Sequence, residues 1–113
     1  MDPVSALLIN RSLDGLSMRA LATAENIANV NSRGFRPLKV SFEDSLKAAL
    51  SGGTAAVRQV TPRVERAPVG AAGEVRIDME LATASETAMR YAALIDLLGR
   101  QMQISRTAIR GGQ

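Results

Sequence analysis

Apolar and small residues recur through the first thirty positions of the chain with alternating spacings of three and four. The set is Ala6, Ile9, Leu13, Leu16, Ala20, Thr23, Ile27 and Val30. This seven-residue repeat predicts an amphipathic helix over residues 3–31. Asp2 and Pro3 suit its N-cap and its first helical position. A second apolar row widens this face beyond the needs of a two-stranded coiled coil, which predicts several neighbours for the helix. That row is Leu7, Leu21, Ala24 and Ala28.

The same alternation returns in the last third of the chain. Its positions are Leu81, Ala84, Ala88, Tyr91, Ile95, Leu98, Met102, Ser105 and Ile109. They predict a second helix over residues 78–110, with Asp78 as its N-cap and Glu80 in its first turn. Gly111 and Gly112 are typical of a helix stop.

The segment between the two helices, residues 32–77, has mixed signals. Gly34 and Pro37 break the periodicity. Ser41, with Asp44 three residues later, predicts the cap of a short helix. Residues 51–73 are rich in Gly, Ala, Pro and Thr and predict a mobile connector with an extended piece. Within and after it, "VRQVTPRV" and "VRID" have the β-branched content of short strands.

Helix length points to an elongated fold. At 1.5 Å per residue the first helix would span roughly 40 Å and the last roughly 50 Å, whereas a compact chain of this size has a radius of gyration of about 13 Å. We therefore predict one mainly α domain over residues 1–113. Its two long terminal helices form an antiparallel, coiled-coil-like pair, with an irregular or short-β connector between them.

The apolar faces of these two helices must pack on each other or on other subunits, since the chain is too short to enclose them in a local core. The strongest apolar positions form a candidate assembly seam. They are Leu13, Leu16, Ile27, Tyr91, Ile95, Leu98, Met102 and Ile109. The pattern indicates an assembly protein.

Composition argues against catalysis. The chain has no cysteine and no histidine, which removes thiol nucleophiles, the commonest general base and nearly all zinc chemistry. We therefore expect no enzyme activity, no metal, no cofactor and no small-molecule substrate. Asp2 and the short apolar run "ALLI" do not fit a signal peptide. Nothing approaches the ~20 apolar residues of a membrane span, so no transmembrane segment is expected.

The excess of basic residues leaves open one alternative function, that of a nucleic-acid-binding protein. The formal net charge is +3 and the sequence pI is 10.2, because most basic residues are arginines. A small, basic, helical nucleic-acid-binding protein would have such a composition. However, Arg90, Arg100, Arg106 and Arg110 scatter around a helix at 100° per residue, with Asp96 among them. Solvated or intersubunit ion pairs fit this scatter better, so no nucleic-acid partner is expected.

The stretch "ATAENIANVNSRGFRP", residues 22–37, resembles the N-terminal signature of flagellar axial proteins, the rod, hook and hook-associated components. The matching positions are Asn26, Ala28, Asn29, Ser32, Gly34 and Phe35. Ser32 stands where threonine is usual in the family, and Arg33 where proline is common. Taken alone, the stretch is also typical of a helix that frays before a turn, with Asn31 or Gly34 in the left-handed conformation.

The segment "IDMELATASETAMRYAALIDLLGRQMQISRTAI", residues 77–109, is similar to the terminal segment of the proximal-rod family of the flagellar basal body. The positions that carry the similarity are Ile77, Asp78, Met79, Glu80, Arg90 and Tyr91. The two resemblances imply a structural subunit of the periplasmic rod that polymerises through its terminal helices. Another flagellar rod subunit is the closest alternative.

The resemblance also implies how such a subunit reaches its place and what it touches. It implies export without a cleaved signal peptide. The implied partners are copies of the same chain, other rod subunits, and the export-gate and membrane-ring proteins at the base of the rod. Phe42 and Leu46, with three residues between them, look like the short element proposed as an export-gate recognition signal in rod and hook subunits.

Overall fold

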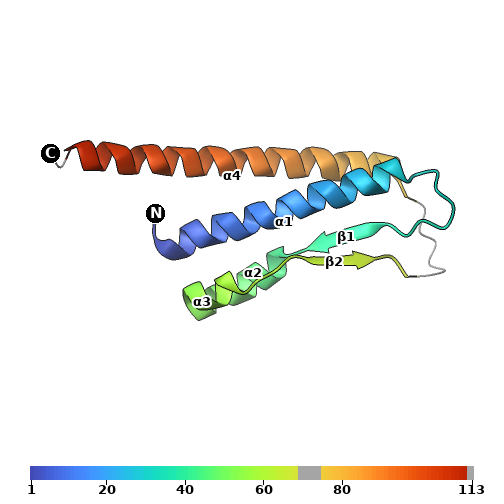
Figure 1. Cartoon of the computed structure of the whole chain (residues 1–113), viewed down its shortest axis with the longest axis horizontal. Coiled ribbons are helices and arrows are strands. Elements are labelled where there is room, and N and C mark those ends of the chain that lie inside the picture. The colour runs from blue at the N-terminus through green and yellow to red at the C-terminus, as the bar shows by residue number, and fades with distance from the viewer. Residues whose placement is uncertain (69–74, 112–113) are drawn as a thin grey trace.

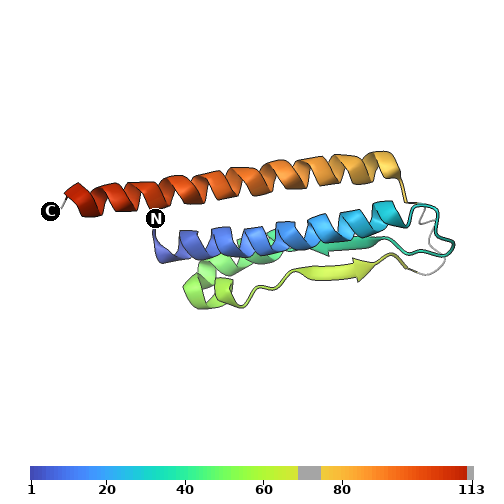
Figure 2. The ribbon, with the colours of Figure 1, turned by 45° about the horizontal axis from the view of Figure 1, so that its top comes forward.

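The computed structural model describes residues 1–68 and 75–111 and shows an elongated, mainly helical molecule (Figure 1). Its extents are 64 × 27 × 13 Å and its radius of gyration is 17.8 Å. Two long terminal helices, α1 (Pro3–Ala28) and α4 (Ile77–Gly111), run antiparallel, as expected from the sequence. In Figures 1 and 2, α1 lies between α4 on one side and a small β-hairpin region on the other.

Helix α1 begins where the sequence predicts. The Asp2 carboxylate accepts a hydrogen bond from the Ser5 backbone N–H at 2.7 Å, and Pro3 occupies the first helical position. The helix ends at Ala28, three residues before the predicted end at residue 31. Asn29 is the reason, since its backbone N–H still bonds to the Glu25 carbonyl while its own dihedral angles leave the helical region.

The hairpin region consists of two short antiparallel strands with helical turns between them. Strand β1 (Leu38–Ser41) pairs with β2 (Arg63–Arg66), so that Leu38 faces Arg66. Between the strands come α2 (Glu43–Ala49), the 3₁₀ turn η1 (Leu50–Gly52) and α3 (Gly53–Arg58).

Three predictions for the middle of the chain were wrong in part. Ser41 lies in β1, and α2 starts after Phe42 without a side-chain cap. Of "VRQVTPRV", residues 57–64, the first two residues end α3 and the last two begin β2. Val57 is helical because it is fully buried in the core, and this packing overrides its β preference. The connector predicted over residues 51–73 is therefore wrong where η1 and α3 are helical, whereas its predicted extended piece is confirmed by β2; residues 69–73 lie outside the described part.

Helix α4 starts one residue earlier than predicted. Ile77 and Asp78 lie in its first turn, so Asp78 is not the N-cap and "VRID" is not a strand. The Glu80 N–H already bonds to the Arg76 carbonyl at 3.0 Å, so the first helical hydrogen bond starts at Arg76. The helix reaches Gly111, and Gly112 lies outside the described residues.

The hydrophobic core lies between α1 and the hairpin region. It is built from Leu16, Ala22, Val40, Phe42, Leu46 and Val57. Helix α4 contributes one buried residue, Thr87, and its Leu94 packs against the edge of the core. The longest helix of the molecule therefore gives few side chains to the core.

Candidate assembly interface

Asn26 is the residue of the "NIANVNSRGF" stretch that joins three elements. Its side-chain amide donates to the Leu38 carbonyl at 2.9 Å, and its side-chain oxygen accepts from the Leu38 N–H at 2.8 Å. The amide thus pairs with β1 as a neighbouring strand would. It also donates to the Glu80 carboxylate on α4 at 3.2 Å. Because Asn26 is only 1% exposed, these bonds form in a dry environment and are costly to lose.

The following residues of the motif build the turn after α1. The Asn29 side chain donates to the Glu25 carbonyl at 2.9 Å and accepts from the Ser32 hydroxyl at 3.0 Å. Gly34 then takes φ = 74°, a left-handed conformation that glycine tolerates best, whereas Asn31 has a negative φ. Phe35 is half-buried under the Arg66 guanidinium, 5.8 Å from the ring centre. Ala28 is exposed. The stretch is therefore an ordered joint.

Phe42 and Leu46, the candidate export signal, are core residues in this fold. They are 2% and 4% exposed. The Phe42 ring lies directly on Gly15 of α1, where a β-carbon would overlap the ring, and the Arg19 guanidinium covers it at 4.8 Å. In this fold, these two side chains pack the hairpin region against α1.

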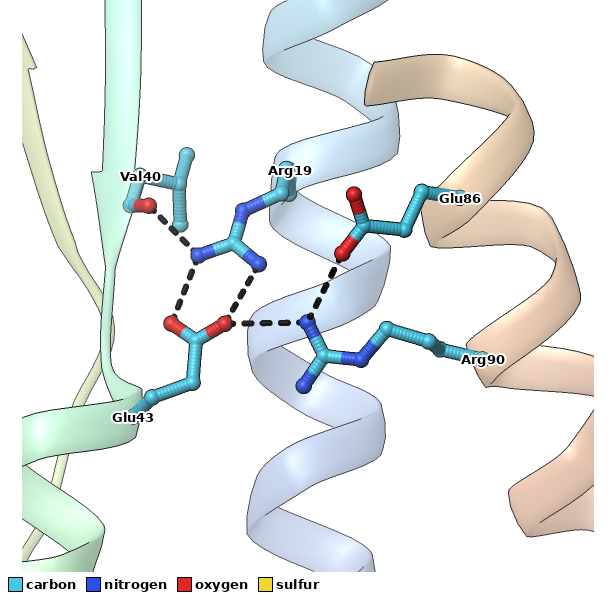
Figure 3. A network of polar contacts seen from close by, with 5 residues as sticks. All are labelled: Arg19, Val40, Glu43, Glu86 and Arg90. Atoms are coloured by element: carbon cyan, nitrogen blue, oxygen red, sulfur yellow. Dashed lines mark hydrogen bonds and ion pairs between the residues drawn. The ribbon is translucent and has the colours of Figure 1, made fainter. Parts of the chain in front are cut away.

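Arg19, Glu43 and Arg90 form an ion-pair network that links α1, α2 and α4 (Figure 3). Arg19 binds the Glu43 carboxylate through two hydrogen bonds of 2.7 Å and also donates to the Val40 carbonyl at 2.8 Å. Arg90 reaches the same carboxylate from α4 at 3.0 Å and lies 4.0 Å from Glu86.

The two arginines stabilise the ionised form of Glu43. The Arg19 hydrogen bonds, helped by Arg90, lower the pKa of Glu43 to about 2. The reciprocal contact with Glu43 raises the pKa of Arg19. One feature of the sequence indicates this network: Arg19 places a charge between Leu16 and Ala22, two buried positions of α1.

The candidate assembly seam behaves differently on the two long helices. On α1, Leu16 is buried and Leu13 and Ile27 are half-buried. On α4 most of the seam is exposed. The exposed fractions are 39% for Tyr91, 45% for Ile95, 53% for Met102 and 68% for Ile109, and Leu81, which begins the same three-and-four row, is 53% exposed. Leu98 is half-buried.

A neighbouring, more polar stripe of α4 faces α1 in place of the apolar seam. Its members are buried or half-buried, namely Glu80, Thr83, Thr87, Leu94 and Gln101. Each precedes by one residue an apolar position of the three-and-four row that contains the seam, so this row is rotated from the contact face by about 100°. Within the chain, α1 therefore covers one side of α4 and leaves its apolar seam open.

Helix α4 also extends past the first turn of α1 (Figure 1). Side chains of α1 near its start share a groove with Leu94, Leu97 and Gln101 of α4. Farther along, Ile104 and Ile109 are 60% and 68% exposed. The C-terminal part of α4 thus presents apolar side chains that the described part of the chain leaves open to solvent.

Comparison with protein-family models and with curated proteins gives no match. Within residues 1–68 and 75–111, no helix combines the length and apolarity needed to cross a membrane. The same residues contain no cluster of three or more acidic side chains suited to a metal ion.

Proposed function

We propose that this chain is a structural subunit of the bacterial flagellar basal-body rod, of the proximal-rod type, that polymerises through its terminal helices. The observation that carries the proposal is the open apolar seam of α4. A run of exposed side chains such as Leu81, Ile95 and Met102 on one helix is unfavourable in an isolated chain and favourable once a neighbour covers it.

The joint at residues 26–35 supports the proposal independently. In the resemblance to flagellar axial proteins this stretch follows the N-terminal helix, and here Asn26 connects that helix to both β1 and α4. A rigid joint fixes the direction in which the hairpin region leaves the helix pair. Such a fixed direction is what a repeating assembly requires of each subunit.

The proposed partners are copies of the chain and other rod subunits, with the export gate and the membrane ring at the base of the rod. The proposed location is the periplasmic rod. Export without a cleaved signal remains part of the proposal. If Phe42 and Leu46 act as an export signal, the hairpin region must detach from α1 for their recognition, because both side chains are buried in the fold.

The test is a replacement of the native copy in its own cell by an Ile95→Glu variant, followed by purification of hook–basal bodies. Ile95 is exposed, so the variant should fold, but a carboxylate in the seam should prevent its burial by a neighbour. The matched control is Ser85→Glu, which places the same charge on an exposed position outside the seam.

We expect peptides such as residues 91–100 in purified basal bodies from wild-type and Ser85→Glu cells, at a few copies relative to the hook subunit. Basal bodies from Ile95→Glu cells should lack the protein and cells should be non-motile. If wild-type basal bodies contain other rod components but not this chain, the proposal is wrong. Binding to nucleic acid at low salt would then be the next measurement.

A further inference from the structure

We propose that the unassembled chain forms a two-fold dimer in which the α4 helices of two copies pack antiparallel and cover each other's exposed apolar residues. This inference deepens the proposed function and rests on it for its role, since it names the partner that covers the seam before the subunit enters an assembly. It starts from Figures 1 and 2, in which α4 forms the outer layer of the molecule, next to α1.

The surface that would form the contact is the part of α4 turned away from α1, which we call the open α4 face. It consists of two rows with a spacing of seven residues. The first row is part of the three-and-four row that contains the seam, namely Leu81, Ala88, Ile95 and Met102. The second row consists of the small, exposed residues Ser85, Ala92 and Gly99.

The open α4 face is accessible to a second helix. Leu81, Ile95 and Met102 are 53%, 45% and 53% exposed. Ala88 and Ala92, near the middle of the two rows, lie about 100° and 140° around the helix from Thr87, the residue buried against α1. A second helix can therefore pack on this face while α1 keeps its place on α4.

Gly99 has no packing role within the described residues. No atom lies within 4 Å of the β-carbon that another residue would carry there. Glycine is unfavourable in a helix interior relative to alanine, and close approach of a second backbone is one reason for its use. The small row therefore fits a surface that receives another helix at short distance.

The two rows fit their own antiparallel copy. When Ala92 of one copy lies level with Ile95 of the other, Ser85 lies level with Met102 and Ala88 with Gly99. The two-fold axis repeats each of these pairs. Ile95 and Met102 then meet small residues of the partner, and the pairs of Ala88 with Gly99 let the helices approach closely.

The ends of the contact are also covered in this register. Leu81 lies level with Arg106 of the second copy, whose aliphatic stem can cover it. Ile77 lies level with Arg110, so the two α4 helices overlap along nearly their whole length. A shift by seven residues in either direction would shorten this overlap.

A parallel pair would fit less well. Each residue would then meet its own copy, so that Met102 would face Met102 and Gly99 would face Gly99. Such pairs crowd one layer and leave a void in the next. Antiparallel packing also places helix dipoles of opposite direction side by side. The sequence of the open α4 face therefore favours the antiparallel arrangement.

The contact is large enough for a dimer. A helix presents about four of every seven positions to a coiled-coil partner, which over residues 77–110 gives about 20 residues per copy. Specific interfaces use about 20–30 residues per side. Because both copies use the same surface, the contact is isologous and closed. The dimer must therefore dissociate before the same face can take part in a larger assembly.

Sedimentation velocity of the full chain over a range of concentrations measures the association. We expect a monomer–dimer equilibrium with a dissociation constant on the order of micromolar and no larger species. Gly99→Leu should weaken the dimer about tenfold, because a large side chain in the small row separates the helices. Ala93→Leu is the matched control, since it adds a similar apolar side chain at an exposed position outside the open α4 face.

The register can be measured with single cysteines, because the chain contains none of its own. In the proposed dimer the two copies of Ala92 lie about 4.5 Å apart along the helix axis, and the two copies of Ser85 about 25 Å apart. A short bis-maleimide should therefore link Ala92→Cys to itself and leave Ser85→Cys unlinked. It should also link Ser85→Cys to Gly99→Cys in a mixture, as identified by mass spectrometry.

Three results would overturn the inference. One is a chain that stays monomeric at high protein concentration. Another is linkage of Ser85→Cys to itself as efficient as that of Ala92→Cys, which would indicate a parallel or unspecific contact. The third is association that becomes stronger in Gly99→Leu, because it would reflect general apolar attraction rather than a fit between the two rows.

Basal-body purification tests the proposed function separately. A chain that stays monomeric in solution but is present in basal bodies would refute the dimer and leave the proposed function standing. A specific dimer of a chain that is absent from basal bodies would refute the proposed function and leave the dimer without its role in assembly. Ser85→Glu separates the two further: it should weaken the dimer, because its carboxylate lies level with Met102 of the second copy, and should still enter basal bodies.

Discussion

Apolar residues of the two long helices are buried in one region and exposed in another. Around Leu16 and Ala22, α1 is enclosed by Val40, Phe42 and other hairpin residues. In the last third of α4, Met102, Ile104 and Ile109 stand 53%, 60% and 68% exposed. Both regions are apolar in the sequence. Periodicity thus predicts that a helix surface is suited to burial. Only the tertiary structure shows whether residues of the same chain bury that surface.

The difference can be tested most strongly by removing one large apolar side chain from each region. Phe42→Ala should lower the free energy of unfolding by about 3–5 kcal/mol, because it leaves a cavity between α1 and α2. Met102→Ala should change it by less than about 0.5 kcal/mol. Urea unfolding followed by circular dichroism measures both. An equal loss in the two variants would mean that Met102 is covered even in the isolated chain.

Two glycines of the long helices sharpen the comparison. At Gly15 a β-carbon would overlap the Phe42 ring, whereas at Gly99 no atom lies within 4 Å. Gly15→Ala should therefore destabilise the protein by about 1–2 kcal/mol, since the overlap outweighs the gain in helix propensity. Gly99→Ala should stabilise it by up to about 1 kcal/mol. The two midpoints of thermal unfolding should move in opposite directions; a shift in the same direction would contradict the close packing at Gly15.

The smallest expected effect concerns the ion-pair network that links α1 and α2 to α4. Glu43 has its pKa lowered from 4.5 to about 2 in the folded chain. The folded state therefore binds fewer protons than the unfolded state in this range, and stability should fall as the pH drops from about 4.5 to about 2. The loss should be about 1 kcal/mol, because the Glu43 side chain is 42% exposed and solvent screens the pairs.

The pH dependence of urea unfolding measures this contribution. Glu43→Gln should lose about 1 kcal/mol at neutral pH and should show a flatter pH profile between about 4.5 and 2. Asp44→Asn, one residue later and exposed, is the matched control and should keep the wild-type profile. A Glu43→Gln profile as steep as that of the wild type would place the acid sensitivity elsewhere.

The parts of the fold that were predicted correctly depend on local signals. Asp2 and Pro3 start α1, and the three-and-four alternation identifies both long helices. The errors fall where distant residues decide. Val57 has a β-branched side chain in a segment rich in Gly and Thr, yet it is helical because the pocket formed by α1 and α2 buries it.

The candidate site divides in the same way. The asparagines and Gly34 indicated a turn after the first helix, and in the structure Asn29 bonds back to the Glu25 carbonyl and Gly34 takes the left-handed conformation. Asn26 bonds to the backbone of Leu38, 12 residues away, and to the carboxylate of Glu80, 54 residues away. Local spacing in the sequence could not predict contacts over these separations. The Arg19, Glu43 and Arg90 network was missed for the same reason.

By itself, then, the sequence determined two long amphipathic helices, their antiparallel arrangement in an elongated molecule, and the absence of cysteine and histidine chemistry. These follow from periodicity and capping, which depend on residues a few positions apart, and from composition, which does not depend on residue order. Only the tertiary structure decided which side of α4 meets α1. The threonine-bearing stripe lies against α1 and the apolar seam, one residue farther on, stays exposed, because the hairpin region and α1 already complete the core without it.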